Sequence, residues 1–160
     1  MRRMTVRGWI TLGVCTLLAG SLWAEGALIR RPAGAPRVFW NFSASMPLGL
    51  YRVVGGRVSS GDLVIFPGKT VPSYGLRVTK YLLKRVISRS GERVTIDGSG
   101  LSIGGKLIAK RVKPFGIRFD GVVPPGDALV LGENPRSFDS RYYGPVPLDE
   151  MTRVEAIVTW

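Results

Sequence analysis

The sequence predicts a mostly β domain, of barrel or sandwich type, carried on a single N-terminal transmembrane helix. Three observations support this fold class. One uncharged apolar stretch, residues 8–24, lies close to the N-terminus. After residue 37 the chain consists of short apolar runs separated by Gly and Pro, which number 21 and 11 in the whole chain. No segment beyond the N-terminal stretch keeps a helical period over about twelve residues, so strands are expected to form the core.

Residues 1–24 are predicted to form a short cytoplasmic segment followed by a membrane anchor. A helix over residues 8–24 would be about 25 Å long, slightly less than a ~30 Å hydrocarbon core. Trp9 and Trp23 lie near its two ends, where aromatic side chains favour the membrane interface. Three arginines precede it and predict a cytoplasmic N-terminus with an exported remainder: Arg2, Arg3 and Arg7. The alternative is a secretory signal peptide that is cleaved after Gly26.

Residues 25–37 are predicted to be a linker, and residues 38–160 a single β domain. Gly104 and Gly105 lie between two apolar runs and predict a two-residue hairpin turn, in which both positions need positive φ. Residues 97–100 predict a second, longer turn. The expected strands are Leu50–Val54, Leu63–Phe66, Leu82–Ile87, Val94–Ile96, Leu101–Ile103, Lys106–Ile108, Ala128–Leu131 and Val154–Trp160.

The net charge of +12 and the pI of about 10.7 favour anionic partners. The basic residues are scattered along the chain, and no aromatic-rich basic motif accompanies them. Lipid head groups therefore explain the charge better than nucleic acid does, and no nucleic-acid partner is expected. A nucleic-acid-binding protein would instead show a steep salt dependence of its affinity for DNA fragments.

The chain contains no histidine, and its one cysteine, Cys15, lies inside the apolar N-terminal stretch. These counts exclude metal sites built on histidine or cysteine, so neither a metal nor another cofactor is expected. They also exclude the imidazole that most often activates a serine nucleophile. Serine chemistry in this chain would need another base, and lysine is a documented substitute. For hydrolysis, two arrangements remain: a Ser/Lys pair or a cluster of carboxylates.

Lys84 is the best candidate for such a base. If residues 82–87 form a strand, alternation places Leu82, Lys84 and Val86 on one face. Apolar neighbours disfavour the charged amine, and lowering its pKa from about 10.4 to about 8 costs roughly 3 kcal/mol. A neutral amine at this position can take a proton from a serine. The alternative is a surface lysine whose aliphatic stem covers the core.

Two further segments carry candidate site residues. Ser45 lies before Pro47 in a predicted turn, which exposes its hydroxyl at a strand edge; it is otherwise a polar loop residue. Its backbone N–H and the Ser43 hydroxyl would form an oxyanion site. The loop after Gly132 offers Ser137 to orient an amine and an ion pair between Asp139 and Arg141 to stiffen the loop. The chemistry of these residues is equally consistent with a solvent-exposed loop that has no role in a site.

These segments, in this order, resemble the signal peptidase I family of membrane-bound Ser/Lys endopeptidases. Residues 43–46 (Ser-Ala-Ser-Met) resemble the nucleophile box of that family, residues 81–87 the box with the general-base lysine, and residues 132–147 the third box. Pro47 follows Met46 directly, as in the TraF-type branch. That branch processes precursors for conjugative transfer, matures pilin precursors and in some cases cyclises them.

The resemblance implies a signal peptidase-like β domain in the bacterial inner membrane, with the site on the periplasmic side. It implies the following roles: Ser45 as nucleophile, Lys84 as general base, Ser43 and the Ser45 N–H as oxyanion donors, Ser137 as a hydrogen-bond partner of the lysine, and Asp139 and Arg141 as structural residues. The expected partners are a precursor or pilin substrate and membrane lipid. Two alternatives stay open, namely a general leader peptidase of secretion and a non-catalytic anchored β module of an extracytoplasmic assembly.

Overall fold

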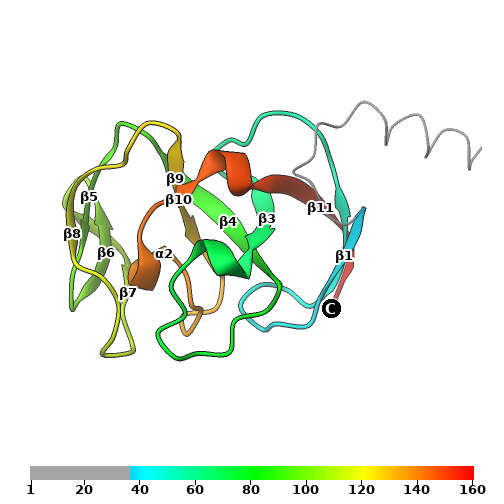
Figure 1. The fold of residues 1–160 in the computed structure, drawn as a ribbon, viewed down its shortest axis with the longest axis horizontal. Coiled ribbons are helices and arrows are strands. Elements are labelled where there is room, and N and C mark those ends of the chain that lie inside the picture. Colours follow the sequence, from blue (N-terminus) through cyan, green and yellow to red (C-terminus); the bar gives the residue numbers. More distant parts are fainter. Residues whose placement is uncertain (1–36) are drawn as a thin grey trace, which may run out of the picture. The chain divides into compact units, whose positions relative to one another are not determined.

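A computed structural model of the chain describes residues 37–160, which form two antiparallel sheets (Figure 1). The predicted anchor over residues 1–24 and nearly all of the predicted linker lie outside the described residues. Within residues 37–160, no helix has the length and apolar character needed to cross a membrane. The expectation of a mostly β domain is confirmed.

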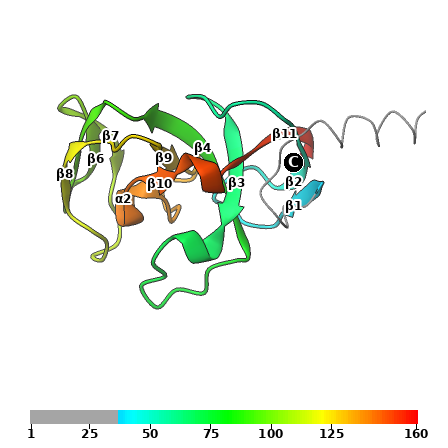
Figure 2. The same ribbon diagram turned by 45° about the horizontal axis from the view of Figure 1, so that its top comes forward.

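The larger sheet contains seven strands in the order β1-β2-β11-β3-β4-β9-β10. They are β1 (Val38–Asn41), β2 (Gly49–Val53), β3 (Leu63–Pro67), β4 (Tyr81–Arg89), β9 (Asp127–Leu131), β10 (Val146–Pro147) and β11 (Thr152–Thr159). The C-terminal strand β11 is inserted between β2 and β3, so the two ends of the domain meet in one sheet. Figure 2 shows β11 lying between the β1–β2 pair and β3.

The smaller sheet contains four strands in the order β7-β6-β5-β8. They are β5 (Arg93–Ile96), β6 (Gly100–Ile103), β7 (Lys106–Lys110) and β8 (Phe119–Val122). Three short helical segments complete the domain: η1 (Gly68–Thr70), α2 (Ser140–Tyr143) and η2 (Leu148–Glu150). The predicted turns over residues 97–100 and at Gly104 and Gly105 connect β5 to β6 and β6 to β7, and both glycines have positive φ.

Strand β9 takes part in two hydrophobic clusters. Val130 and Ala128 belong to the cluster inside the larger sheet, with Val64 and Phe66 of β3. Leu129, between them, belongs to the cluster under the smaller sheet. A strand that is buried on both faces reads as a continuous apolar run, and residues 128–131 have this pattern.

All eight predicted strands are present, with their ends shifted by at most two residues. Strands β1, β8 and β10 and the single turn α2 were not predicted. Asp120 and Gly121 within β8 have low strand propensity, and pairing with β5 holds this segment extended. The β10 segment contains a proline and pairs with β9 over only two residues. Tertiary pairing, rather than local pattern, therefore creates β8 and β10.

Candidate active site

The loop between β1 and β2 carries Ser43 and Ser45 and is held in shape by Asn41. Asn41 is buried, and its Nδ2 lies 2.9 to 3.1 Å from the carbonyl oxygens of Ser43, Met46 and Pro47. Its Oδ1 accepts a hydrogen bond from the Ser43 N–H at 3.1 Å. One side chain thus satisfies backbone groups at both ends of the loop. Met46, which is 2 % exposed, packs into the hydrophobic core and so anchors the loop to the domain.

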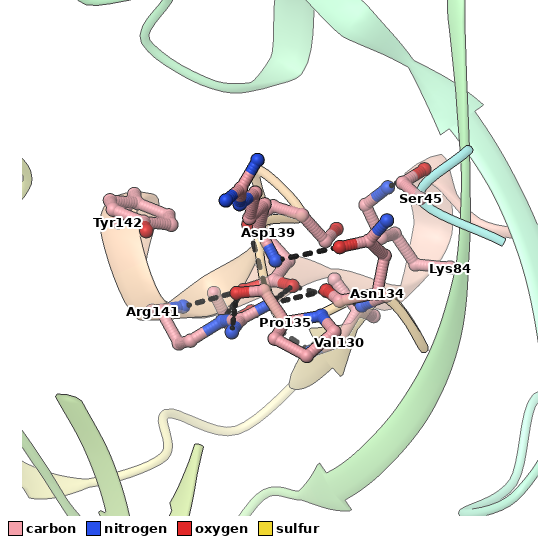
Figure 3. A network of polar contacts seen from close by, with 12 residues as sticks. Ser45, Lys84, Val130, Asn134, Pro135, Asp139, Arg141 and Tyr142 are labelled. Carbon is pink, nitrogen blue, oxygen red and sulfur yellow. Dashed lines mark hydrogen bonds and ion pairs between the residues drawn. The ribbon is translucent and has the colours of Figure 1, made fainter. Parts of the chain in front are cut away.

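Lys84 lies on β4 and is 1 % exposed, among the largest fully buried side chains in the described part of the chain. Its Nζ donates hydrogen bonds to Ser45 Oγ at 2.8 Å and to the carbonyl oxygen of Leu83 at 3.0 Å (Figure 3). Leu83 and Val86 are buried as well, so β4 is enclosed on both faces here rather than on one. The structure therefore brings together two side chains that are 39 residues apart in the sequence.

Burial sets the protonation of this amine. It lowers the pKa of Lys84 from 10.5 to about 8, with a smaller contribution from the charge of Arg141, while the carboxylate of Asp139 acts in the opposite direction. A substantial neutral fraction is then present near pH 8. A neutral amine has a lone pair, so the same short contact allows the Ser45 hydroxyl to pass its proton to Lys84.

The two expected oxyanion donors lie side by side at the surface of the site. The Ser45 N–H points to Ser43 Oγ at 3.4 Å, and the Ser43 hydroxyl donates to Ser45 Oγ at 3.1 Å. Ser43 is exposed and Ser45 is half-buried, so a peptide carbonyl has access to both. A carbonyl oxygen beside Ser45 would replace these mutual hydrogen bonds, because a hydroxyl can rotate toward a new acceptor.

Asp139 and Arg141 form a buried ion pair behind the site. Arg141 is 3 % exposed, and its guanidinium donates to both carboxylate oxygens of Asp139, at 2.8 and 2.6 Å. Its remaining donors reach four backbone carbonyl oxygens: those of Lys110, Asn134, Pro135 and Ser137. Asp139 also caps α2 by accepting from the Arg141 N–H and accepts a hydrogen bond from the Gly132 N–H at 2.9 Å. The pair thus connects backbone groups along residues 132–141, as Figure 3 shows for Asn134 and Pro135.

Residues 132–141 are in turn tied to the Ser45 loop. The Asn134 N–H donates to the carbonyl oxygen of Ser45 at 3.2 Å. Gly132 packs so closely beneath this contact that an added Cβ would clash with the Ser137 side chain and come within 2.7 Å of the Ser45 carbonyl oxygen. A side chain at position 132 would therefore displace the serine loop from Lys84.

One implied contact is absent from this site. The resemblance implied a hydrogen bond between Ser137 and Lys84, but within the described residues Ser137 Oγ is buried without a hydrogen-bond partner. The Lys84 amine is occupied by Ser45 and Leu83 instead. Ser137 lies against Gly132 and, through its backbone carbonyl, accepts from Arg141. A buried hydroxyl without a hydrogen-bond partner costs free energy of folding.

Two residues that shape the site were not singled out from the sequence. Asn41 lies two residues before Ser43. Asparagine side chains often accept a hydrogen bond from the backbone N–H two residues on, so the sequence could have predicted this role. Gly132 begins the third box, but its requirement for a missing side chain follows only from packing against Ser137 and the Ser45 carbonyl oxygen.

Comparisons with known proteins identify the family of this chain. A family model described as signal peptidase, peptidase S26, matches residues 9–160. The conjugal transfer protein TraF of Agrobacterium fabrum is 35 % identical, over 77 % of this chain and 81 % of its own length. The plasmid transfer protein TraF of Escherichia coli is 26 % identical, over 99 % and 98 %.

A solved structure is also similar: a signal peptidase I from Enterococcus faecalis V583 has 26 % sequence identity and a TM-score of 0.39, over 65 % of this chain and 98 % of that one. The family model spans nearly the whole chain, and the relatives named here share the TraF name. The chain therefore belongs to the signal peptidase S26 family, in its TraF-type branch.

Proposed function

We propose that this protein is a serine endopeptidase that processes an exported precursor of a conjugative transfer system, such as a pilin precursor. Ser45 is the nucleophile and Lys84 the general base. The observation that carries this proposal is the 2.8 Å contact between Ser45 Oγ and the Nζ of a lysine that is 1 % exposed. The family membership and the names of the TraF relatives support the substrate class.

The reaction begins when neutral Lys84 takes the proton of the Ser45 hydroxyl as Oγ attacks the scissile carbonyl carbon. The Ser45 N–H and the Ser43 hydroxyl stabilise the resulting oxyanion. The protonated Lys84 then gives its proton to the leaving amine, and the peptide bond breaks to leave an acyl-enzyme on Ser45. Water hydrolyses this ester, or an amine of the substrate attacks it and forms a new peptide bond, which cyclises the product.

The proposal places this chemistry on the extracytoplasmic face of the bacterial inner membrane. The arginines at the N-terminus and the apolar residues 8–24 support this location, because such a segment directs the following chain across the membrane.

Removal of the Ser45 hydroxyl provides the direct test. Purified full-length protein is incubated with the pilin precursor of the same conjugative system, and the products are weighed by mass spectrometry. We expect the wild type to release a shortened or cyclised product, and the Ser45→Ala variant to release none. The exposed Ser99→Ala variant serves as the matched control and should keep full activity. Equal cutting by Ser45→Ala, or no cutting by the wild type, would refute the proposal, and cutting of a secretory precursor alone would indicate a general leader peptidase.

The cleavage rate should depend on pH through the Lys84 amine. Only the neutral amine accepts the serine proton, and burial lowers its pKa to about 8. The rate is therefore expected to rise about tenfold per pH unit below pH 8 and to level off above it. Initial rates measured on one precursor between pH 6 and pH 10 test this. A flat profile across that range would exclude Lys84 as the base.

A further inference from the structure

The connection between β3 and β4, residues 68–80, forms a cleft outside the Ser45–Lys84 site. Its volume is about 810 Å³, and nine residues line it: Pro67, Gly68, Lys69, Val71, Ser73, Val78, Thr79, Lys80 and Tyr81. In Figures 1 and 2 this connection leaves the sheet as one projecting loop (green). The mechanism described above uses none of these residues.

The cleft is held open by contacts at both ends of the connection. At its base, the Gly68 N–H donates to the carbonyl oxygen of Lys80 at 2.9 Å, and an added Cβ on Gly68 would clash with Thr79. At its tip, the Tyr74 hydroxyl donates to the carbonyl oxygen of Tyr142 in α2 at 3.3 Å. The Tyr74 ring also stacks on Phe115, with ring centroids 5.6 Å apart. The cleft is therefore preformed, which lowers the entropic cost of binding a ligand.

The charged side chains of the cleft are all basic. Lys69 and Lys80 line it and are exposed, and Arg77 belongs to the same connection. Residues 67–81 contain no aspartate or glutamate. None of the ion pairs found within residues 37–160 involves Lys69, Arg77 or Lys80. A concave site that carries two exposed cations and no carboxylate is suited to an anionic group.

Strand β4 joins this cleft to the site. Tyr81 lines the cleft, and Lys84 is three residues further along the same strand. From Tyr81 to Lys84, β4 pairs with β3 on one side, whereas its pairing with β9 begins only at Arg85. At about 3.3 Å per extended residue, Lys80 lies roughly 13 Å from Lys84. Four extended substrate residues cover the same distance. A substrate residue about four positions from the scissile bond therefore reaches the cleft.

We infer that the cleft of residues 67–81 is a subsite for an acidic side chain of the precursor, held by Lys69 and Lys80 about four residues from the scissile bond. This inference rests on the proposed peptidase function for its substrate. It adds a specificity determinant that lies outside the Ser45–Lys84 pair.

The first experiment measures binding and is independent of cleavage. Fluorescently labelled tetraglutamate and tetraglutamine peptides, both acetylated and amidated, are titrated onto the full-length protein. The cleft variant is Lys69→Glu/Lys80→Glu. The control is Lys106→Glu/Lys110→Glu on β7, which changes two exposed lysines and lowers the net charge by the same amount. We expect wild type and control to bind tetraglutamate about fivefold more tightly than tetraglutamine, and the cleft variant to lose this preference.

Equal binding of both peptides by the wild type, or the same loss in the control, would overturn the subsite. So would a cleft variant that loses binding to phosphatidylglycerol vesicles but keeps its preference for tetraglutamate, because the cleft would then serve lipid head groups.

The second experiment maps cleavage in a defined peptide mixture. The wild type should favour Asp or Glu about four positions from the cut, and the cleft variant should favour Lys or Arg there. Cleavage without an acidic preference would refute the subsite and leave the peptidase intact. If nothing is cleaved, the peptidase proposal fails, and the binding experiment alone decides whether the cleft takes carboxylates.

Discussion

The Lys84→Met variant is expected to lose precursor cleavage by roughly 10²- to 10⁴-fold in kcat while remaining folded. Methionine has nearly the length of the lysine side chain and is apolar, so it fills the same buried space beside Ser45. What it lacks is the lone pair that takes the serine proton. With no histidine in the chain, no imidazole can replace this base.

The same variant should be more stable than the wild type at neutral pH. The folded-state pKa of Lys84 is lowered from 10.5 to about 8, which corresponds to roughly 3 kcal/mol of lost stability below pH 8. Between pH 8 and pH 10.5 the unfolded chain binds more protons at this residue than the folded chain. The contribution of Lys84 to the free energy of unfolding therefore rises with pH over this window.

Initial rates and denaturant unfolding at pH 7 and pH 10 test both consequences. Lys106→Met on the exposed strand β7 is the matched control and should change neither quantity. A Lys84→Met protein that cuts within tenfold of the wild-type rate would remove Lys84 from the mechanism. A Lys84→Met protein that is less stable than the wild type by several kcal/mol at pH 7 would contradict the free-energy cost assigned to burying the lysine amine.

The Asp139→Ala variant should lower the free energy of unfolding by about 3–5 kcal/mol, because it leaves a buried guanidinium without its counter-charge. Asp139 is 0 % and Arg141 3 % exposed, so water cannot replace the lost carboxylate. The Gly132 N–H loses its acceptor as well. Since Asn134 links this loop to the Ser45 carbonyl, cleavage should fall together with stability.

Urea unfolding of Asp139→Ala beside Asp120→Ala measures this effect. Asp120 pairs with Arg93 at the surface, where the side chains are 62 % and 69 % exposed, and such pairs contribute about 0–1 kcal/mol. The double variant Asp139→Leu/Arg141→Met should recover much of the loss, because no charge is left buried. Equal, small effects of the two aspartate variants would show that the buried pair contributes no more than a surface pair.

Local pattern predicted most of the strands of this protein and pointed to its candidate site residues. Six of the eight predicted strands are apolar runs with Gly, Pro or Asp next to at least one end, a signal that depends only on neighbouring residues. The absence of histidine excluded an imidazole base and left lysine as the documented substitute, and apolar neighbours pointed to Lys84. The order of the three boxes then identified the family, which the comparisons confirm.

The tertiary structure alone decided which groups meet. Ser45 precedes β2 and Lys84 lies on β4, and β11 and β3 separate those two strands in the sheet. Their 2.8 Å contact therefore depends on how the whole sheet curls, which no local pattern encodes. The demand for glycine at position 132 likewise becomes visible only in the folded chain, where residue 132 packs against Ser137 and the Ser45 carbonyl oxygen. Sequence patterns report the preferences of neighbouring residues, whereas a site is built by contacts between residues that only the complete fold brings together.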